Sequence, residues 1–280
     1  MTSTGPSGGR DRTRRARDER GAGGLRNVLV TLLTVGVVAG LALFVPGLLP
    51  PVLRTPLSEP VGQPPPADAG GAPDTPVVRT DDGGTYRFAA VQRGSEEPVT
   101  YSSCEPIAVE VNVQGAPEPE SALRMVLDGM DRISEATGLV LEYAGPSDRR
   151  PEWERGEFTV PQDELDDPPP VLVSFADAAE VPQLQGQVAG IAGSVVVAQG
   201  GVRRYLTGQV TLDTESFGDL AARRDGDEVA AAITLHELGH LVGLDHVDDS
   251  DELMHAVTTD QRDFGPGDRE GLRRLGGGPC

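Results

Sequence analysis

The four histidines of this 280-residue sequence all fall within 20 residues, at positions 236, 240, 246 and 255. On a helix, His236 and His240 are four residues apart, so their imidazoles point to the same side and can share one metal ion. His246 follows Gly243, a residue type that can turn the chain back after a helix. Three neutral imidazoles leave one position of a tetrahedral zinc ion open, which is typical of a catalytic site. We therefore expect His236, His240 and His246 to bind one zinc ion.

Glu237 lies beside the first of these histidines, where its carboxylate could accept a proton from water without binding the metal. This is the arrangement of a general base. Bound zinc lowers the pKa of water from about 15.7 to about 7, which makes a nucleophile available at neutral pH. A purely structural histidine cluster would have no use for a carboxyl group here. Glu237 is therefore the candidate catalytic residue for hydrolysis of a peptide bond.

A helix must carry His236 and His240, and the residues before them predict one. Acidic residues at positions 225 and 227 suit a helix N-terminus, where the helix dipole favours negative charge. Apolar residues continue up to the histidines, and Gly243 can adopt the left-handed conformation that ends a helix. We expect this helix to run from about residue 225 to Gly243.

An earlier long helix is indicated between Pro119, which is tolerated in a first helical turn, and Gly138, which suits a C-terminal cap. The apolar residues between them fall on one face. Strands and helices alternate along the chain, which predicts an α+β fold with a mixed sheet and a crossover helix. Short apolar or alternating segments predict strands at residues 107–113, 139–143, 171–175, 188–198 and 209–213.

Residues 236–246 read His-Glu-Leu-Gly-His-Leu-Val-Gly-Leu-Asp-His. They match the H-E-x-x-H-x-x-G-x-x-H motif of the metzincin zinc metalloproteases at every defined position. Met254 follows the third histidine by eight residues, where metzincins place the methionine of the Met-turn. Residues 267–276 resemble the closing helix of the matrixins, one branch of the metzincins. The sequence is therefore similar to a matrixin over about residues 85–280.

This resemblance implies a zinc-dependent endopeptidase that acts on peptide or protein substrates, with Glu237 as the general base. It implies a metzincin-like α+β fold, in which a mixed twisted sheet and two long helices lie above the cleft. A small C-terminal subdomain from residue 247 onwards would carry the Met-turn and the last helix. The alternative is a catalytically degenerate, zinc-containing interaction module on a membrane stalk.

The resemblance also indicates where a substrate would lie. Residues 188–198 would form the edge strand that pairs with an extended peptide, and residues 209–213 its inner neighbour. Residues 257–264 would form the wall of the pocket for the residue after the scissile bond.

The sequence departs from the matrixin pattern beside the Met-turn. His255 and Ala256 stand where matrixins usually have tyrosine and proline. His255 could be a fourth metal ligand, or it could line the pocket or face solvent. No histidine remains for the second, structural zinc of many matrixins, and the cysteine-switch motif of the animal enzymes is missing.

Five acidic residues surround the third metal ligand. One of them could brace the ring of His246 through its second nitrogen, as carboxylates near metal sites often do. Together they could bind calcium, or they could form a solvated acidic loop. These residues are Asp245, Asp248, Asp249, Asp251 and Glu252.

Cys104 and Cys280 are the only cysteines. A disulfide between them is expected if both lie in an oxidising compartment. It would join the start of the first predicted strand to the last residue and contribute about 5 kcal/mol in the chain-entropy model. A competing hypothesis makes Cys104 a thiolate that blocks the zinc in a latent form.

The N-terminal region predicts a membrane location. Residues 1–26 carry seven arginines and three acids, so this arm has a net charge of +4 and is expected in the cytoplasm. An uncharged, mostly apolar run of 18 residues follows at 28–45, long enough to cross a bilayer as a helix. We interpret residues 27–49 as a transmembrane anchor with the catalytic domain outside the cell; the alternative is a cleaved signal peptide and secretion.

Residues 50–84 are rich in proline and glycine and have no apolar periodicity, which indicates a linker before a domain at 85–280. The formal net charge of the chain is −20, and because the arm is +4, the remainder is −24. A surface this acidic disfavours nucleic acid as a partner. We expect a monomer.

Overall fold

The computed structural model describes residues 75–280 except 154–164 and 166. This part of the chain contains a five-stranded mixed sheet. Four strands run parallel, and the edge strand β6 runs antiparallel to β7. All five overlap predicted strands, although β7 begins seven residues before residue 209. Across the sheet the order is β4 (Leu141–Pro146), β3 (Ile107–Asn112), β5 (Val171–Ala176), β7 (Val202–Asp213) and β6 (Gly190–Gln199).

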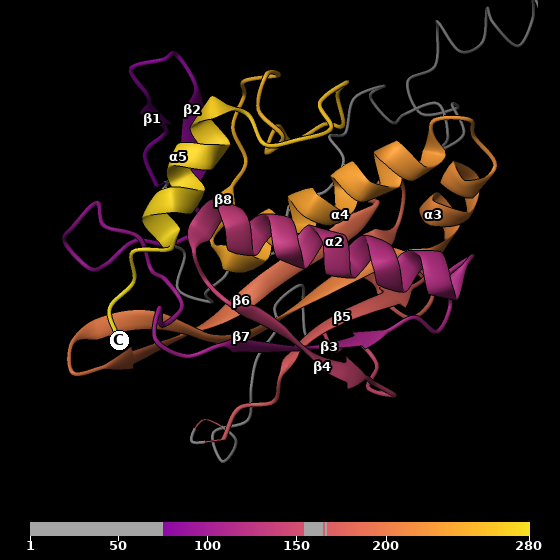
Figure 1. The fold of residues 1–280 in the computed structure, drawn as a ribbon, viewed down its shortest axis with the longest axis horizontal. Coiled ribbons are helices and arrows are strands. Elements are labelled where there is room, and N and C mark those ends of the chain that lie inside the picture. Colours follow the sequence, from indigo (N-terminus) through magenta and orange to yellow (C-terminus); the bar gives the residue numbers. More distant parts are fainter. Residues whose placement is uncertain (1–74, 154–164, 166) are drawn as a thin grey trace, which may run out of the picture. The chain divides into compact units, whose positions relative to one another are not determined.

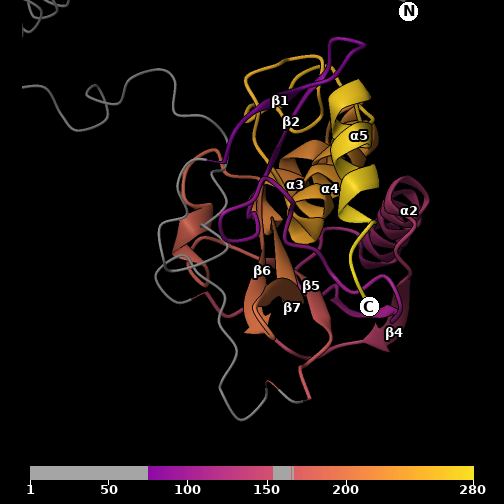
Figure 2. The same cartoon turned by 90° about the vertical axis from the view of Figure 1, so that its left-hand side faces the viewer.

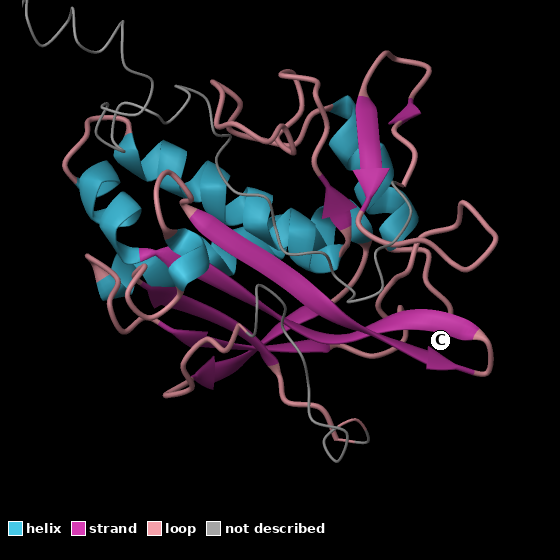
Figure 3. Ribbon diagram, turned by 180° about the vertical axis from the view of Figure 1, so that it is seen from behind, coloured by secondary structure: helices cyan, strands magenta, loops and turns pink. Residues whose placement is uncertain are grey.

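Two long helices cover one face of this sheet. They are α2 (Pro119–Thr137) and α4 (Gly226–Val242), and the short helix α3 (Thr214–Ala221) adjoins α4. Figures 1 and 3 show the helical layer on the same side of the strands from opposite views. The expected α+β class, with a twisted mixed sheet under two long helices, is confirmed.

Helix α2 has the predicted bounds for the predicted reasons. Pro119 occupies its first turn, and Gly138 follows its last residue with φ of 80°, in the left-handed region. Gly129, in the middle of the helix, lets α2 approach α4, because an added Cβ there would lie 2.8 Å from Leu238 Cδ1. The close packing of α2 against α4 therefore requires glycine at position 129.

All six residues of β5 are buried, because both faces of the sheet are covered at this strand. The helices lie on one face, and residues 149–153 cross the other. Arg150 donates a hydrogen bond to the carbonyl oxygen of Phe175 at 2.9 Å, and the Trp153 indole donates one to Thr211 Oγ1 at 3.0 Å. Residues 149–153 are thus bound to the sheet; residues 154–164 and 166 lie outside the described residues.

A second, three-stranded sheet joins the N-terminal part of the domain to the region after α4. It consists of β1 (Val78–Arg79), β2 (Thr85–Phe88) and β8 (Leu244–Asp245), all antiparallel, and helix α5 (Pro266–Leu275) packs beside β2. Figure 2 shows β1 and β2 next to α5. The sequence assigned residues 75–84 to the linker, whereas β1 already pairs with β2. Thr75 is also buried, and its hydroxyl donates a hydrogen bond to the carbonyl of Phe88.

The predicted arginine-rich arm, the apolar segment 27–49 and most of the linker lie outside the described residues. Within the described part of the chain, none of the helices has the length and apolar character needed to cross a membrane.

The structure contains the disulfide that the sequence predicts. Cys104, in the loop before β3, is bonded to Cys280, with a Cα–Cα distance of 5.2 Å. The adjacent segments also touch, since the Ser103 hydroxyl donates a hydrogen bond to the carbonyl oxygen of Gly278 at 2.7 Å. Because Cys104 is bonded to sulfur, the hypothesis of a zinc-blocking thiolate is wrong for this structure.

Replacing Cys280 by serine should lower the free energy of unfolding by up to about 5 kcal/mol, because the disulfide closes a loop spanning 176 residues. Urea unfolding of the wild type and of Cys280→Ser, followed by circular dichroism, measures this difference. A reducing agent should destabilise the wild type and leave the variant unchanged. Equal unfolding midpoints for the oxidised wild type and the variant would contradict the prediction.

Candidate metal centre

Helix α4 carries the first two candidate ligands and is enclosed by the fold. Asp227 and Glu228 lie in its first turn, where their charge is favourable. Thirteen of its 17 residues are buried, because the sheet, α2, α3 and α5 surround it. Gly243 ends it with φ of 117°, a backbone conformation that residues with a Cβ rarely adopt. His236 and His240 therefore stand on a rigid element that turns sharply just beyond them.

The third candidate ligand is guided to the helix by β8. After Gly243 the chain pairs with β2, and the Ala89 N–H donates a hydrogen bond to the Gly243 carbonyl oxygen at 2.8 Å. The His246 N–H then donates one to Asp245 Oδ1 at 2.8 Å. Strand β2 thus helps to place His246 opposite the helix.

The three histidines converge on one point. Their Nε2 atoms lie 3.0 Å apart for His236 and His240, and 3.1 Å apart for each of these with His246. Three nitrogens bound tetrahedrally at 2.0–2.1 Å from a zinc ion would be about 3.3 Å apart. The spacing therefore fits one small cation held by all three rings, and among the described residues no other group of histidine, cysteine or acidic side chains has such geometry.

Backbone carbonyls orient two of the rings. Nδ1 of His236 lies 2.7 Å from the Leu253 carbonyl oxygen, and Nδ1 of His240 lies 2.9 Å from that of Leu244. A carbonyl accepts only, so each Nδ1 carries the proton and donates it. This tautomer leaves the lone pair on Nε2, directed at the common point.

Burial also keeps the rings in the neutral form that binds metal. Burial, together with the neighbouring histidines, lowers the pKa of His236 and of His246 to about 3 and that of His240 well below 6.5. Neutral imidazoles are thus available across the physiological pH range.

Glu237 is buried beside the triad, with 6% of its surface exposed. Burial raises the pKa of its carboxyl group to about 8. A cation on the three histidines would favour the charged form and lower this pKa. The side chain lies against Gly190, the first residue of the edge strand β6, where an added Cβ would come within 2.8 Å of Glu237 Cγ.

Met254 lies beneath the helix that carries the ligands. It is 1% exposed, and an added Cβ at Gly239 would lie 2.8 Å from its sulfur. The Val247 N–H donates a hydrogen bond to the Met254 carbonyl oxygen at 3.0 Å, so the chain after the third ligand pairs with the turn. The sequence placed Met254 in this turn, and the structure packs it against the middle of the metal-binding motif.

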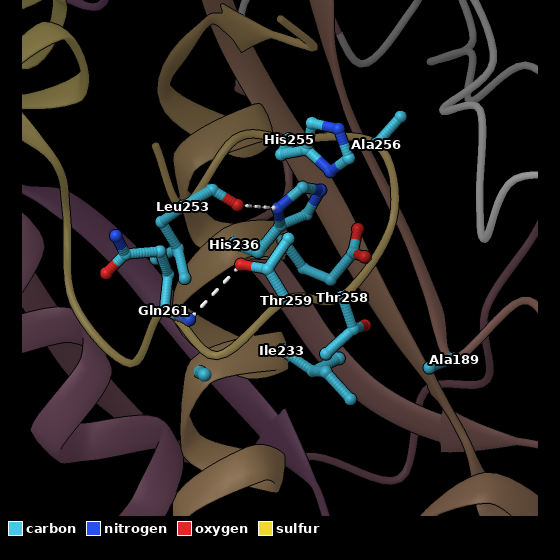
Figure 4. Close-up of a pocket in the computed structure, with 11 residues that line it drawn as sticks. Ala189, Ile233, His236, Leu253, His255, Ala256, Thr258, Thr259 and Gln261 are labelled. Atoms are coloured by element: carbon cyan, nitrogen blue, oxygen red, sulfur yellow. Dashed lines mark hydrogen bonds between the residues drawn. The ribbon is translucent and has the colours of Figure 1, made fainter. Parts of the chain in front are cut away.

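A pocket opens beside His236 (Figure 4). Residues of helix α4, the Met-turn and the loop that follows line it. The segment 257–264, predicted as the pocket wall, contributes three lining residues. The lining consists of Ala189, Ala232, Ile233, His236, Glu237, Leu253, His255, Ala256, Thr258, Thr259 and Gln261.

His255 lines this pocket and lies outside the group of three side chains that could hold a metal ion. Its Nδ1 lies 2.9 Å from the carbonyl oxygen of Val257, within its own loop. This placement corresponds to the pocket-lining alternative that the sequence left open.

The acidic residues near His246 do not behave as one solvated loop. Asp245 accepts from the backbone of His246, and Asp249 accepts a hydrogen bond from the Thr85 hydroxyl at 3.3 Å. Glu252 is completely buried, so the solvated interpretation is wrong for this residue.

Sequence reasoning missed the neighbours that hold the site together. Leu244 and Leu253 act through carbonyl oxygens, which leave no trace in a side-chain pattern. Gly190 could have drawn attention as a glycine at the start of a predicted strand, a position that often marks close backbone approach.

The three convergent histidines could hold one metal ion next to the buried carboxyl group of Glu237. Residues 173–276 match the family model for Matrixin. The predicted resemblance to metzincin zinc metalloproteases of the matrixin kind is therefore confirmed.

Two solved structures match part of this chain. Metalloproteinase-II from Bacteroides fragilis is 12% identical and has a TM-score of 0.38, with 64% of this chain and 55% of that chain covered. Archaemetzincin from Methanopyrus kandleri is 14% identical and has a TM-score of 0.34, with 60% and 94% covered. The chain thus spans about half the length of the first structure. No curated protein matches the sequence.

Replacing Gly190 by alanine should lower hydrolytic activity at least tenfold, because the new Cβ would push the Glu237 side chain out of place. Zinc content per chain, measured by atomic emission, should stay unchanged because the three histidines are untouched. Gly218→Ala in α3 is the matched control, since an added Cβ there meets nothing within 4 Å. Wild-type turnover by Gly190→Ala would argue against the inferred contact.

Proposed function

We propose that this protein is a zinc-dependent endopeptidase. The observation that carries the proposal is the convergence of three neutral imidazoles, with Nε2 atoms 3.0–3.1 Å apart, next to the buried carboxyl group of Glu237. The match to the Matrixin family model supports a metallopeptidase function in general. His236, His240 and His246 would hold the zinc ion.

The residues of the chain suggest how hydrolysis proceeds. When bound, zinc would act as a Lewis acid that makes water acidic and polarises the substrate carbonyl. Glu237 would accept a proton from the water as it attacks the carbonyl carbon, and would then donate this proton to the departing amine. Burial of Glu237 suits this double role, because an apolar environment raises the stability of the protonated carboxyl group between the two transfers.

The position of the site next to β6 suggests how a substrate is aligned. β6 is the last strand of the sheet, and its first residue, Gly190, touches Glu237. An extended peptide could add to such an edge strand through backbone hydrogen bonds. The side chain after the scissile bond would then enter the pocket between α4 and residues 256–261.

We further propose that the domain lies outside the cell, on a membrane anchor formed by residues 27–49. The uncharged apolar run and the arginine-rich arm before it support this location. The Cys104–Cys280 disulfide supports an oxidising compartment.

Purified full-length protein should bind one zinc ion per chain and cleave an unstructured protein such as casein. A chelator should abolish cleavage, and added zinc should restore it. Glu237→Ala should retain the zinc and lose about 10²- to 10⁴-fold in activity, because proton transfer is removed and the ligands remain. Product formation and metal content are measured on the same samples.

The matched control is Glu228→Ala, which removes an exposed carboxylate from the first turn of the same helix. It should keep wild-type activity. Equal cleavage by Glu237→Ala would refute the role of Glu237. A wild type that binds zinc and cleaves nothing in a broad peptide library would instead favour the degenerate interaction module.

The anchor predicts that the mature protein in membranes retains its N-terminus. Mass spectrometry of the N-terminal peptide from membrane fractions measures where the chain begins. Detection of residues 1–26 would support the anchor. A mature chain that begins near residue 43 and is found in the medium would show that the segment is a cleaved signal.

A further inference from the structure

Glu252 is a completely buried carboxylate two residues before the methionine of the Met-turn. Its Oε1 accepts hydrogen bonds from the backbone N–H of Thr85, at 3.1 Å, and of Gly267, at 2.9 Å. Its Oε2 accepts one from the N–H of Asp268 at 3.0 Å. One side chain therefore joins the Met-turn to strand β2 and to the first turn of helix α5, elements far apart in the sequence.

The backbone around this carboxylate is closed in by glycines. An added Cβ would lie 2.7 Å from Glu252 Oε1 at Gly84 and 2.2 Å from Oε2 at Gly265. At Gly267, an added Cβ would meet the backbone of Thr85 at 2.2–2.4 Å. β2, the start of α5 and Glu252 can come together only because these three positions lack side chains. We call this arrangement the Glu252 cradle; it comprises Gly84, Thr85, Glu252, Gly265, Gly267 and Asp268.

A second buried carboxylate continues the contact to the metal centre. Asp268 is also fully buried, and its Oδ2 accepts hydrogen bonds from the N–H of Leu253 at 2.6 Å and of Gly265 at 3.0 Å. The carbonyl of the same Leu253 accepts the hydrogen bond from His236 Nδ1 at 2.7 Å. Leu253 is thus fixed on one side by Asp268 and on the other side orients a metal-binding ring.

Stability alone gives no reason for two carboxylates here. Burying charged groups costs free energy that hydrogen bonds repay only in part, and apolar side chains of similar size are often as stabilising. Burial, with a smaller contribution from the nearby Glu252 carboxylate, raises the pKa of Asp268 to about 7, so the charged form of Asp268 is costly here. The two carboxylates do fix the orientation of the surrounding backbone, because they accept hydrogen bonds from five backbone N–H groups.

We propose that Glu252 is a positioning residue for the metal centre: through the cradle and Asp268 it fixes the Leu253 carbonyl, and thereby the His236 ring, at the geometry that the metal requires. This inference rests on the proposed function of the three histidines as a zinc site. It gives β2 a second role in that site, through the hydrogen bond between Thr85 and Glu252, in addition to its pairing with β8 next to His246.

Glu252→Gln in the full-length protein tests this role, because the amide keeps the size of the side chain but presents N–H to one of the backbone donors. Zinc affinity, measured by competition with a chelator, should fall about 10- to 100-fold, as found when groups that orient metal ligands are lost. The visible absorption spectrum of the Co²⁺-substituted protein should change, since it reports the arrangement of the ligands. Glu270→Gln in helix α5 changes a carboxylate that is ion-paired with Arg273 and Arg274 outside the cradle, and it should leave both the affinity and the spectrum unchanged.

Asp268→Asn provides an independent variant, because its target is the Leu253 N–H directly. A weakened zinc site and an altered Co²⁺ spectrum in either folded variant would support the proposal. Wild-type affinity and spectrum in a folded variant would overturn it, even if thermal stability had fallen. Failure of both variants to fold would also overturn it, because the cradle would then serve folding alone. If the wild type itself bound no zinc, the proposed function would be the part that failed.

Discussion

Three imidazole nitrogens must lie about 3 Å apart, although two belong to a helix and the third to the chain beyond its end. A rigid helix satisfies half of this requirement, because the spacing of His236 and His240 follows from helical geometry. The other half depends on the turn at Gly243 and on the chain that leaves it. That chain has only two residues in β8 before His246, and β2 supplies the hydrogen bonds that fix them.

The same requirement explains why so many glycines lie around α4. The Met-turn, the edge strand β6 and helix α2 must all approach this one helix, and a Cβ at the contact points would hold them apart. Gly239 admits the sulfur of Met254, Gly190 admits Glu237, and Gly129 admits Leu238 from the far side. Close packing of this kind leaves few alternatives for the side chains involved, so the positions of the ligands are set by the packing of the whole domain.

The features that could be predicted from the sequence are those with a local cause. Spacing and backbone preference over a few residues predict the ends of the two long helices at Gly138 and Gly243. They also predict the five strands and the three histidine ligands. Helix α3 was missed because its eight residues are too short for a clear periodicity, although Asp213 caps it by accepting from the Ser216 N–H. β1 and β2 were missed because two and four residues, paired with distant segments, carry no pattern of their own.

The residues of the candidate site also differ in whether they could be predicted from the sequence. His236, Glu237 and His240 are recognisable because side chains do their chemistry, whereas the acceptors that orient the rings are main-chain oxygens of Leu244 and Leu253. Glu252 is a residue whose side chain suggested the wrong environment. An acidic residue in a run of acids suggests a solvated surface. Glu252 is buried instead, because Thr85 and Gly267, which are distant in the sequence, donate backbone hydrogen bonds to its carboxylate.

The metal ligands and the pocket wall are held in place by different parts of the structure. The ligands and Glu237 stand on or next to a buried helix, but the outer wall of the pocket is the loop 256–261, whose side chains bond mainly within the loop and to residues just before it. The Gln261 side chain donates to the carbonyl of Asp251 at 3.0 Å, and the Thr259 hydroxyl accepts from the Gln261 N–H at 3.1 Å. Such a loop can change shape through substitutions that leave the core intact. In the proposed endopeptidase the reaction type would therefore be tied to the fold, while the side chain accepted after the scissile bond would depend on residues such as His255, Ala256 and Thr258.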